Sequence, residues 1–117
     1  MKKAIFSLFL GLAFLCAHAF PLHASWFKAD KITMYSQRGC PHCTEALKYI
    51  QKNHPKLAIE IVELNNKDAL ERFYACADKF SIARNRVGTP LICFEKDYVM
   101  GWSSENAKKF EKLVPSK

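Results

Sequence analysis

The 117-residue sequence contains no internal repeat, no linker-like stretch and no run of basic residues interleaved with aromatic ones. The first two absences indicate a single domain, because a chain of this length supports one core and no more. The third argues against nucleic-acid binding despite a formal net charge of +7, since the lysines are scattered among acidic residues. Half of the residues are hydrophobic and 13% are aromatic, so the chain can form a packed core.

The N-terminal apolar stretch is too short for an ordinary membrane-spanning helix. Ala4 to Leu15 provides about a dozen apolar residues, whereas a span needs about 20. The stretch follows the positive pair Lys2-Lys3 and precedes Ala17-His18-Ala19, which has the small-x-small pattern of a signal-peptidase site. Residues 1–19 are therefore predicted to be a signal peptide that is cleaved after Ala19.

Two alternatives for this segment stay open at the level of sequence. Cleavage after Ala24 is a poorer second candidate. Alternatively, the apolar run could extend through Phe20 and remain as an uncleaved anchor. Only in that case would the protein be attached to a membrane. Cys16 is expected to leave with the signal, because a lipoprotein site needs a small residue where Leu15 stands. Either way the domain is predicted to lie outside the cytosol, in an oxidising compartment, which in a bacterium means the periplasm or a secreted location.

Residues 26–117 alternate between strand and helix patterns. Strands are predicted over residues 32–35, 57–64, 91–94 and 98–100. Helices are predicted over residues 40–53, after the Asn65-Asn66 cap, and after Ser103 or Ser104. The second of these helices would bury one apolar face, made of Leu70, Phe73, Cys76, Ala77 and Phe80. The order βαβαββα, with a parallel pair followed by a hairpin, predicts an α/β domain with a mixed four-stranded sheet.

Between the first predicted strand and the first predicted helix lies Arg38-Gly39-Cys40-Pro41-His42-Cys43. A C-x-x-C pair at such a junction suits thiol–disulfide exchange, in which the nucleophile is a thiolate. Cys40 would stand at the helix N-terminus, where backbone N–H groups and the helix dipole favour an anion. His42 could donate a hydrogen bond and Arg38 adds positive charge, so both are predicted to lower the pKa of the Cys40 thiol. Cys43, one turn further, is predicted to be the resolving thiol.

With this motif, the chain resembles the thioredoxin superfamily, and in size and element order a glutaredoxin-like domain. Val87-Gly88-Thr89-Pro90 is similar to the family's segment that carries a cis-proline opposite the C-x-x-C pair, and Gly101-Trp102 falls where glutaredoxins have a glycine pair. The resemblance covers Lys31 to about Leu113 and implies a three-layer thioredoxin-like fold. It also implies that Pro90 is cis, that the Thr89 backbone pairs with a substrate chain, and that Gly101 and Trp102 border the substrate site.

The residues between the two cysteines depart from the glutaredoxin pattern. Glutaredoxins usually have Pro-Tyr there, whereas this chain has Pro41-His42, the pair of DsbA-type periplasmic thiol oxidases. Pro41 suits the first helical turn, where its missing N–H is no loss. The resemblance implies that a histidine at position 42 favours the reduced, thiolate form and so makes the disulfide more oxidising. Trp102 replaces the second glycine of the glutaredoxin pair, which argues against glutathione binding.

The leading hypothesis is an exported thiol–disulfide oxidoreductase that exchanges disulfides with cysteine-containing protein substrates through Cys40 and Cys43. The oxidase direction is favoured, no metal or organic cofactor is required, and a separate redox partner would reset the pair. The alternatives are a glutathione-linked, glutaredoxin-type reductase, a metal-binding module that uses His42 with the two cysteines, and a redox-inert structural module.

The sequence leaves open whether Cys76 and Cys93 form a second disulfide. They could be two small buried hydrophobic residues, or they could form a second disulfide in an oxidising compartment. A disulfide needs Cα atoms within about 7 Å, which the sequence does not reveal. A zinc site is disfavoured, because these two cysteines do not stand at ligand spacing from the C-x-x-C pair.

Overall fold

The computed structural model describes residues 31–115, so the predicted signal peptide and its cleavage positions, Ala19 and Ala24, lie outside the described residues. The elements are β1 (Ile32–Ser36), α2 (Pro41–Asn53), β2 (Ile59–Glu63), α3 (Lys67–Lys79), β3 (Leu91–Cys93), β4 (Tyr98–Met100) and α4 (Ser104–Leu113). Their order, βαβαββα, is the predicted one. The strands β2 and β3 are shorter than predicted, and α2 begins one residue later, at Pro41.

The four strands form one mixed sheet with the order β2-β1-β3-β4. The central strand β1 runs parallel to β2, with Met34 opposite Ile61, and antiparallel to β3, with Tyr35 opposite Leu91. The hairpin partner of β3 is β4. The predicted parallel pair and hairpin are therefore confirmed, and β1 and β3 are the inner strands.

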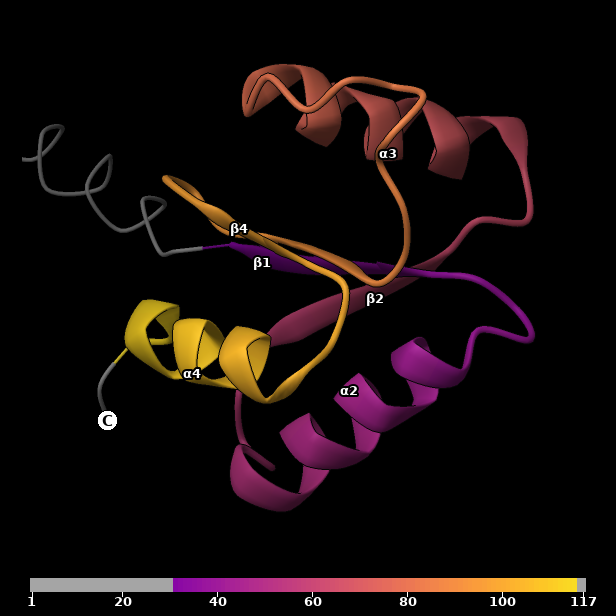
Figure 1. Ribbon diagram of the computed structural model, residues 1–117. Coiled ribbons are helices and arrows are strands. Elements are labelled where there is room, and N and C mark those ends of the chain that lie inside the picture. The colour runs from indigo at the N-terminus through magenta and orange to yellow at the C-terminus, as the bar shows by residue number, and fades with distance from the viewer. Residues whose placement is uncertain (1–30, 116–117) are drawn as a thin grey trace, which may run out of the picture.

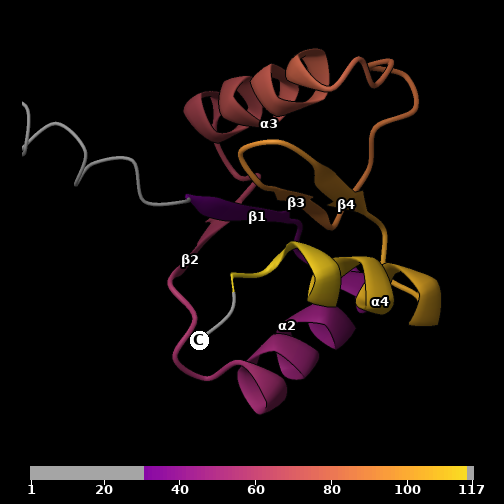
Figure 2. The same ribbon diagram turned by 90° about the vertical axis from the view of Figure 1, so that its left-hand side faces the viewer.

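Helices cover both faces of the sheet, which gives three layers. Figures 1 and 2 show α3 on one face and both α2 and α4 on the other. Because side chains alternate along a strand, Met34 faces a core shared with α2 and α4, whereas Tyr35 faces a core shared with α3. Every residue of β1 is buried, as expected for a central strand between two helical layers.

Helix α3 is positioned by two local signals. Its N-cap is Asn66, whose side chain accepts a hydrogen bond from the Ala69 N–H at 2.8 Å. The prediction that Leu70 belongs to the buried face is wrong, because Leu70 is 41% exposed and Ala69 takes the inward position instead. Ala69 and Phe73 lie four residues apart on the face toward the sheet, and Leu70 is rotated away from it by one helical step.

Helix α4 closes the second core. Its N-cap is Ser103, one of the two predicted candidates, which accepts a hydrogen bond from the Asn106 N–H. Phe110 is completely buried and has edge-to-face contacts with Phe94 and Trp102. Within residues 31–115, the helices are all too short or too polar to cross a membrane.

Candidate active site

The C-x-x-C segment lies at the junction of β1 and α2. The chain leaves β1 through a turn in which Gly39 has φ +78°, a left-handed conformation that glycine adopts without steric cost. Cys40 is the N-cap of α2 and has an extended backbone, and Pro41 occupies the first helical position. The predicted helix start is therefore correct to within one residue.

The two cysteines form a disulfide but differ in exposure. Their Cα atoms are 5.2 Å apart. Cys43 is 3% exposed and packs in the core between the sheet and α2, whereas Cys40 is partly exposed at the helix end. The Cys43 N–H donates a hydrogen bond to Cys40 Sγ at 3.1 Å, so the helix N-terminus points at the outer sulfur. A thiol partner from solution can therefore reach Cys40 and not Cys43.

The Thr89–Pro90 segment lies against the outer sulfur. Its peptide bond is cis, as the family resemblance implies. The Thr89 hydroxyl donates to Cys40 Sγ at 3.6 Å, and the Thr89 carbonyl oxygen is 3.8 Å from the same sulfur. The two segments meet because Leu91, directly after Pro90, pairs with Tyr35 at the end of β1 from which the C-x-x-C turn departs.

His42 and Arg38 are both exposed near Cys40. His42 Nδ1 is 3.0 Å from Glu45 Oε1, and the His42 side chain is 63% exposed. Among the described residues, the hydrogen bonds to Cys40 Sγ come from Cys43 and Thr89 and not from His42. The pKa-lowering role predicted for His42 and Arg38 therefore stays a prediction, and in this arrangement it would act through charge rather than through direct contact.

Gly101 and Trp102 follow β4 directly, and Gly101 supports the cis-proline through a backbone hydrogen bond. The Gly101 N–H donates to the Pro90 carbonyl at 2.8 Å, and Gly101 has φ +81°. The Trp102 ring packs on Tyr49 and Phe110, with ring centroids 5.3 Å and 6.0 Å away, and it is partly buried. Trp102 thus contributes to the core next to α2, and its predicted place at the border of a substrate site stays a prediction.

The structure joins Cys76 of α3 to Cys93 of β3 in a second disulfide, which decides the assignment that the sequence left open. Their Cα atoms are 6.6 Å apart, within the range that a disulfide spans. This pair lies on the α3 face of the sheet, whereas Cys40 and Cys43 lie at the start of α2 on the opposite face. Across residues 31–115, no three His, Cys, Asp or Glu side chains cluster as metal ligands would.

The sequence prediction missed one contact of the site, the hydroxyl of Thr89 on the outer sulfur. The family resemblance predicts a role for the backbone of Thr89 and none for its side chain. Its hydroxyl could be placed only once the pairing of β1 with β3 was known, because 49 residues separate it from Cys40.

The three layers and the mixed four-stranded sheet define a thioredoxin-like α/β fold of the glutaredoxin type. Two solved glutaredoxins are similar to this chain. Glutaredoxin 1 from Francisella tularensis, whose crystal structure is complexed with cacodylate, has a TM-score of 0.50 and 22% identity over 72% of this chain and 99% of its own. The glutaredoxin from Archaeoglobus fulgidus has a TM-score of 0.52 and 20% identity over 79% of this chain and 94% of its own.

No protein-family model matches the sequence, and no curated protein does. At these identities the solved structures establish the fold alone. The activity must therefore be inferred from the site itself.

Proposed function

We propose that this protein is an exported thiol–disulfide oxidoreductase that uses Cys40 and Cys43 on protein substrates, with oxidation as the favoured direction. The observation that carries the proposal is the asymmetry of the disulfide. Cys40 is partly exposed, receives the Cys43 N–H, and faces the cis Thr89–Pro90 segment, whereas Cys43 is 3% exposed. Thiol–disulfide exchange needs one reachable sulfur and one shielded partner.

In the oxidising direction, a substrate thiolate attacks Cys40 Sγ, and the Cys40–Cys43 bond breaks with Cys43 leaving as a thiolate. A second substrate thiolate then attacks the substrate sulfur of the mixed disulfide and releases Cys40 as a thiolate. The substrate has lost two electrons and gained a disulfide, and the Cys40–Cys43 pair has gained them. The N–H of Cys43 and the hydroxyl of Thr89 stabilise the Cys40 thiolate, which makes it a good leaving group.

A second candidate is a glutaredoxin-type reductase, which is suggested by the similarity of the fold to the two solved glutaredoxins described above. The two candidates use the same cysteines and differ in the direction of electron flow. The residue pair Pro41-His42 supports oxidation, and Trp102, in place of a second glycine, argues against glutathione as the reductant.

The reduction potential of the Cys40–Cys43 pair tests the direction. We expect a value nearer the roughly −120 mV of DsbA than the roughly −270 mV of thioredoxin. Equilibration of the purified domain in glutathione buffers, with thiol trapping and mass spectrometry of the Cys40–Cys43 peptide, measures it. A Cys40→Ser variant should neither oxidise a reduced model protein nor reduce insulin. A potential near that of thioredoxin, with rapid glutathione-dependent turnover, would favour the reductase instead.

Export is proposed from the signal-like residues 1–19, and the Cys76–Cys93 disulfide supports it, because disulfides persist mainly in oxidising compartments. When the full chain is expressed in a bacterium, the protein in the periplasmic or medium fraction is expected to begin at Phe20. A start at Ser25 would indicate the second cleavage position. An intact N-terminus in the membrane fraction would indicate an anchor, and one in the cytosol would contradict export.

A further inference from the structure

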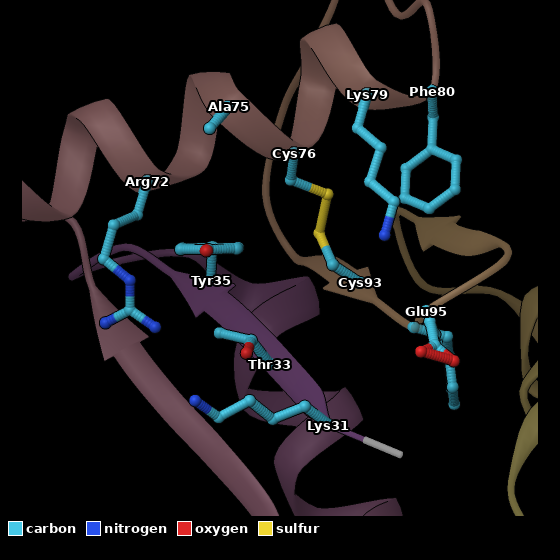
Figure 3. Close-up of a pocket in the computed structure, with 11 residues that line it drawn as sticks. Lys31, Thr33, Tyr35, Arg72, Ala75, Cys76, Lys79, Phe80, Cys93 and Glu95 are labelled. Carbon is cyan, nitrogen blue, oxygen red and sulfur yellow. A yellow bond between two sulfur atoms is a disulfide. The ribbon is translucent and has the colours of Figure 1, made fainter. Parts of the chain in front are cut away.

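A pocket on the α3 face of the sheet has the Cys76–Cys93 disulfide in its wall. Figure 3 shows the disulfide bridging α3 and β3, with Lys79 pointing down from α3 and Lys31 below Thr33 at the lower edge of the view, and both lysines line the pocket. The volume is about 520 Å³, which lies within the roughly 300–1,000 Å³ typical of small-molecule sites. This pocket is separate from the C-x-x-C site, because Cys93 pairs with Thr33 near the start of β1, whereas Cys40 follows the end of that strand.

The two cysteines of this second disulfide differ in solvent exposure. Cys76 is 8% exposed and packs under α3, whereas Cys93 is partly exposed on β3. Exchange requires a thiolate to approach one sulfur while the other departs. An incoming thiol in the pocket would therefore attack Cys93, and Cys76 would be the leaving group.

The charged residues that line the pocket favour an anionic ligand. Three basic side chains, Lys31, Arg72 and Lys79, line it together with one acidic side chain, Glu95. Arg72 is paired with Glu60 through hydrogen bonds of 3.0 Å and 2.8 Å, and Lys31 also lies close enough to Glu60 to help lower the pKa of that carboxyl. With Glu60 included, three basic side chains stand against two acidic ones, which leaves a net charge of +1. Nearby cations also stabilise a departing thiolate and so promote exchange.

We propose that Cys76–Cys93 is a second, exchangeable disulfide that reacts with small anionic thiols in this pocket. The thiolate of the small thiol attacks Cys93 Sγ and forms a mixed disulfide at Cys93. The Cys76–Cys93 bond breaks, and Cys76 leaves as a thiolate that takes a proton from water. A second molecule of the small thiol attacks the sulfur of the first one in this mixed disulfide and releases Cys93 as a thiol. The two small-thiol molecules leave joined as a disulfide. The Cys76–Cys93 pair gains two electrons, and the two small-thiol molecules lose them.

This exchange would act on the segment beside the active site. The loop that the disulfide closes runs from Cys76 to Cys93 and contains Thr89 and Pro90. Breaking the bond removes the covalent link between the two ends of that loop. The redox state of this pair would therefore influence how firmly the Thr89–Pro90 segment is held against Cys40.

Reaction with reduced glutathione, a small thiol of net negative charge, tests the proposal without any assay of activity. The probe is applied to the folded Cys40→Ser/Cys43→Ser variant, excess thiol is trapped, and non-reduced tryptic peptides are mapped. Lys79, Arg84 and Arg86 separate Cys76 from Cys93, so the modified cysteine is identified directly. The wild-type chain gives the same map, because Cys40 and Cys43 fall in another peptide, and it serves if the double variant folds poorly.

The expected result is a glutathione adduct on Cys93 and a free thiol at Cys76 under native conditions. Replacing Lys31 and Lys79 with Gln should slow the reaction of glutathione about two- to fivefold relative to cysteamine, a cationic thiol, as expected for exposed charges. Lys48→Gln/Lys52→Gln removes the same charge from α2, on the other face of the sheet, and should leave that ratio unchanged.

Three outcomes would overturn the proposal. The disulfide could stay intact in native protein and react only in denaturant, which would make it purely structural. The adduct could form on Cys76, which would contradict the direction of attack. The ratio of glutathione to cysteamine rates could be the same in both lysine variants, which would remove the anionic preference. None of these outcomes depends on whether Cys40 and Cys43 catalyse exchange.

Discussion

At the scale of single residues, the outer sulfur is held by contacts from two distant parts of the chain. Cys43, three residues away, donates its N–H, and Thr89, 49 residues away, donates its hydroxyl. Both are hydrogen-bond donors, and donors at these positions would stabilise negative charge on Cys40 in the reduced protein. The thiolate of Cys40 therefore depends on tertiary structure as much as on its place at a helix N-terminus.

Thr89→Val removes the hydroxyl and keeps a β-branched side chain of similar size. The pKa of the reduced Cys40 thiol is expected to rise, because one hydrogen bond that stabilises the thiolate is lost. The ultraviolet absorbance of the thiolate, followed against pH, measures the change. Thr89→Ser keeps the hydroxyl and is the matched control. If the Val and Ser variants titrated alike, the hydroxyl would have no effect on Cys40.

At the scale of elements, a small polar network joins the end of α2 to α4. Glu111 of α4 accepts a hydrogen bond from the Tyr49 hydroxyl and lies 2.8 Å from His54 Nε2. The hydrogen bond from Tyr49, and then that from His54, lowers the pKa of the Glu111 carboxyl below its ordinary value. Conversely, the hydrogen bond to Glu111 and then burial raise the pKa of the Tyr49 hydroxyl. The network therefore clamps two helices that cover the same face of the sheet.

The lowered pKa of Glu111 makes this clamp sensitive to acid. In the unfolded chain the carboxyl binds a proton near its ordinary pKa of about 4.3. The folded protein keeps the carboxylate to lower pH, so the stabilisation is present above about pH 4.3 and is lost as pH falls through the folded pKa. Glu111→Gln should therefore be less stable than wild type by about 0.5 kcal/mol at neutral pH, a small value because Glu111 is 41% exposed.

Denaturant unfolding at several pH values between neutral and pH 3 measures this difference. The gap between Glu111→Gln and wild type is expected to narrow as the pH falls. Glu71→Gln, which replaces an exposed glutamate on α3, is the matched control for loss of one carboxylate. A gap that stayed constant to pH 3 would show that the charge of Glu111 contributes nothing to the clamp.

At the scale of the whole molecule, the Cys76–Cys93 disulfide ties the α3 layer to the sheet. Its two cysteines are separated by 17 positions in the sequence, whereas Cys40 and Cys43 are separated by only 3. The chain-entropy relation predicts a loss of about 3 kcal/mol for Cys76→Ser/Cys93→Ser. The same relation gives an upper bound of about 1.5 kcal/mol for Cys40→Ser/Cys43→Ser, and the loss should fall below it because an oxidising pair has a stabilised reduced form. Urea unfolding of both variants and of the oxidised wild type measures the two losses. Equal losses would contradict the assignment of the second disulfide as the main covalent tie.

Much of the fold follows from patterns that are local in the sequence. The buried stretch from Ile32, the cap at Asn66 and the hairpin before Met100 each depend on residues within a few positions, so the order of elements was predictable. The outward position of Leu70 was not, because an apolar residue at the flank of a helix faces the core or the solvent according to how the helix sits on the sheet.

In the candidate site, too, some features could be predicted from the sequence and others could not. The C-x-x-C pair, its place at the start of a helix and the buried position of Cys43 could all be predicted, since each follows from spacing along one segment. The cis state of Pro90 was implied by family resemblance, and not by the physics of the segment alone. The network of Tyr49, His54 and Glu111 was not predicted, because it joins residues 57 and 62 positions apart.

The sequence by itself determined which elements form, in which order, and where the C-x-x-C pair of the proposed redox site lies, because short-range periodicity, caps and the Cys40–Cys43 spacing decide those features. Only the tertiary structure decided that Cys76 meets Cys93 and that the Thr89 hydroxyl lies on Cys40. Both contacts depend on the antiparallel pairing of β1 with β3 and on the docking of α3 over the sheet. Such packing depends on the summed burial of many side chains, and no single motif encodes it.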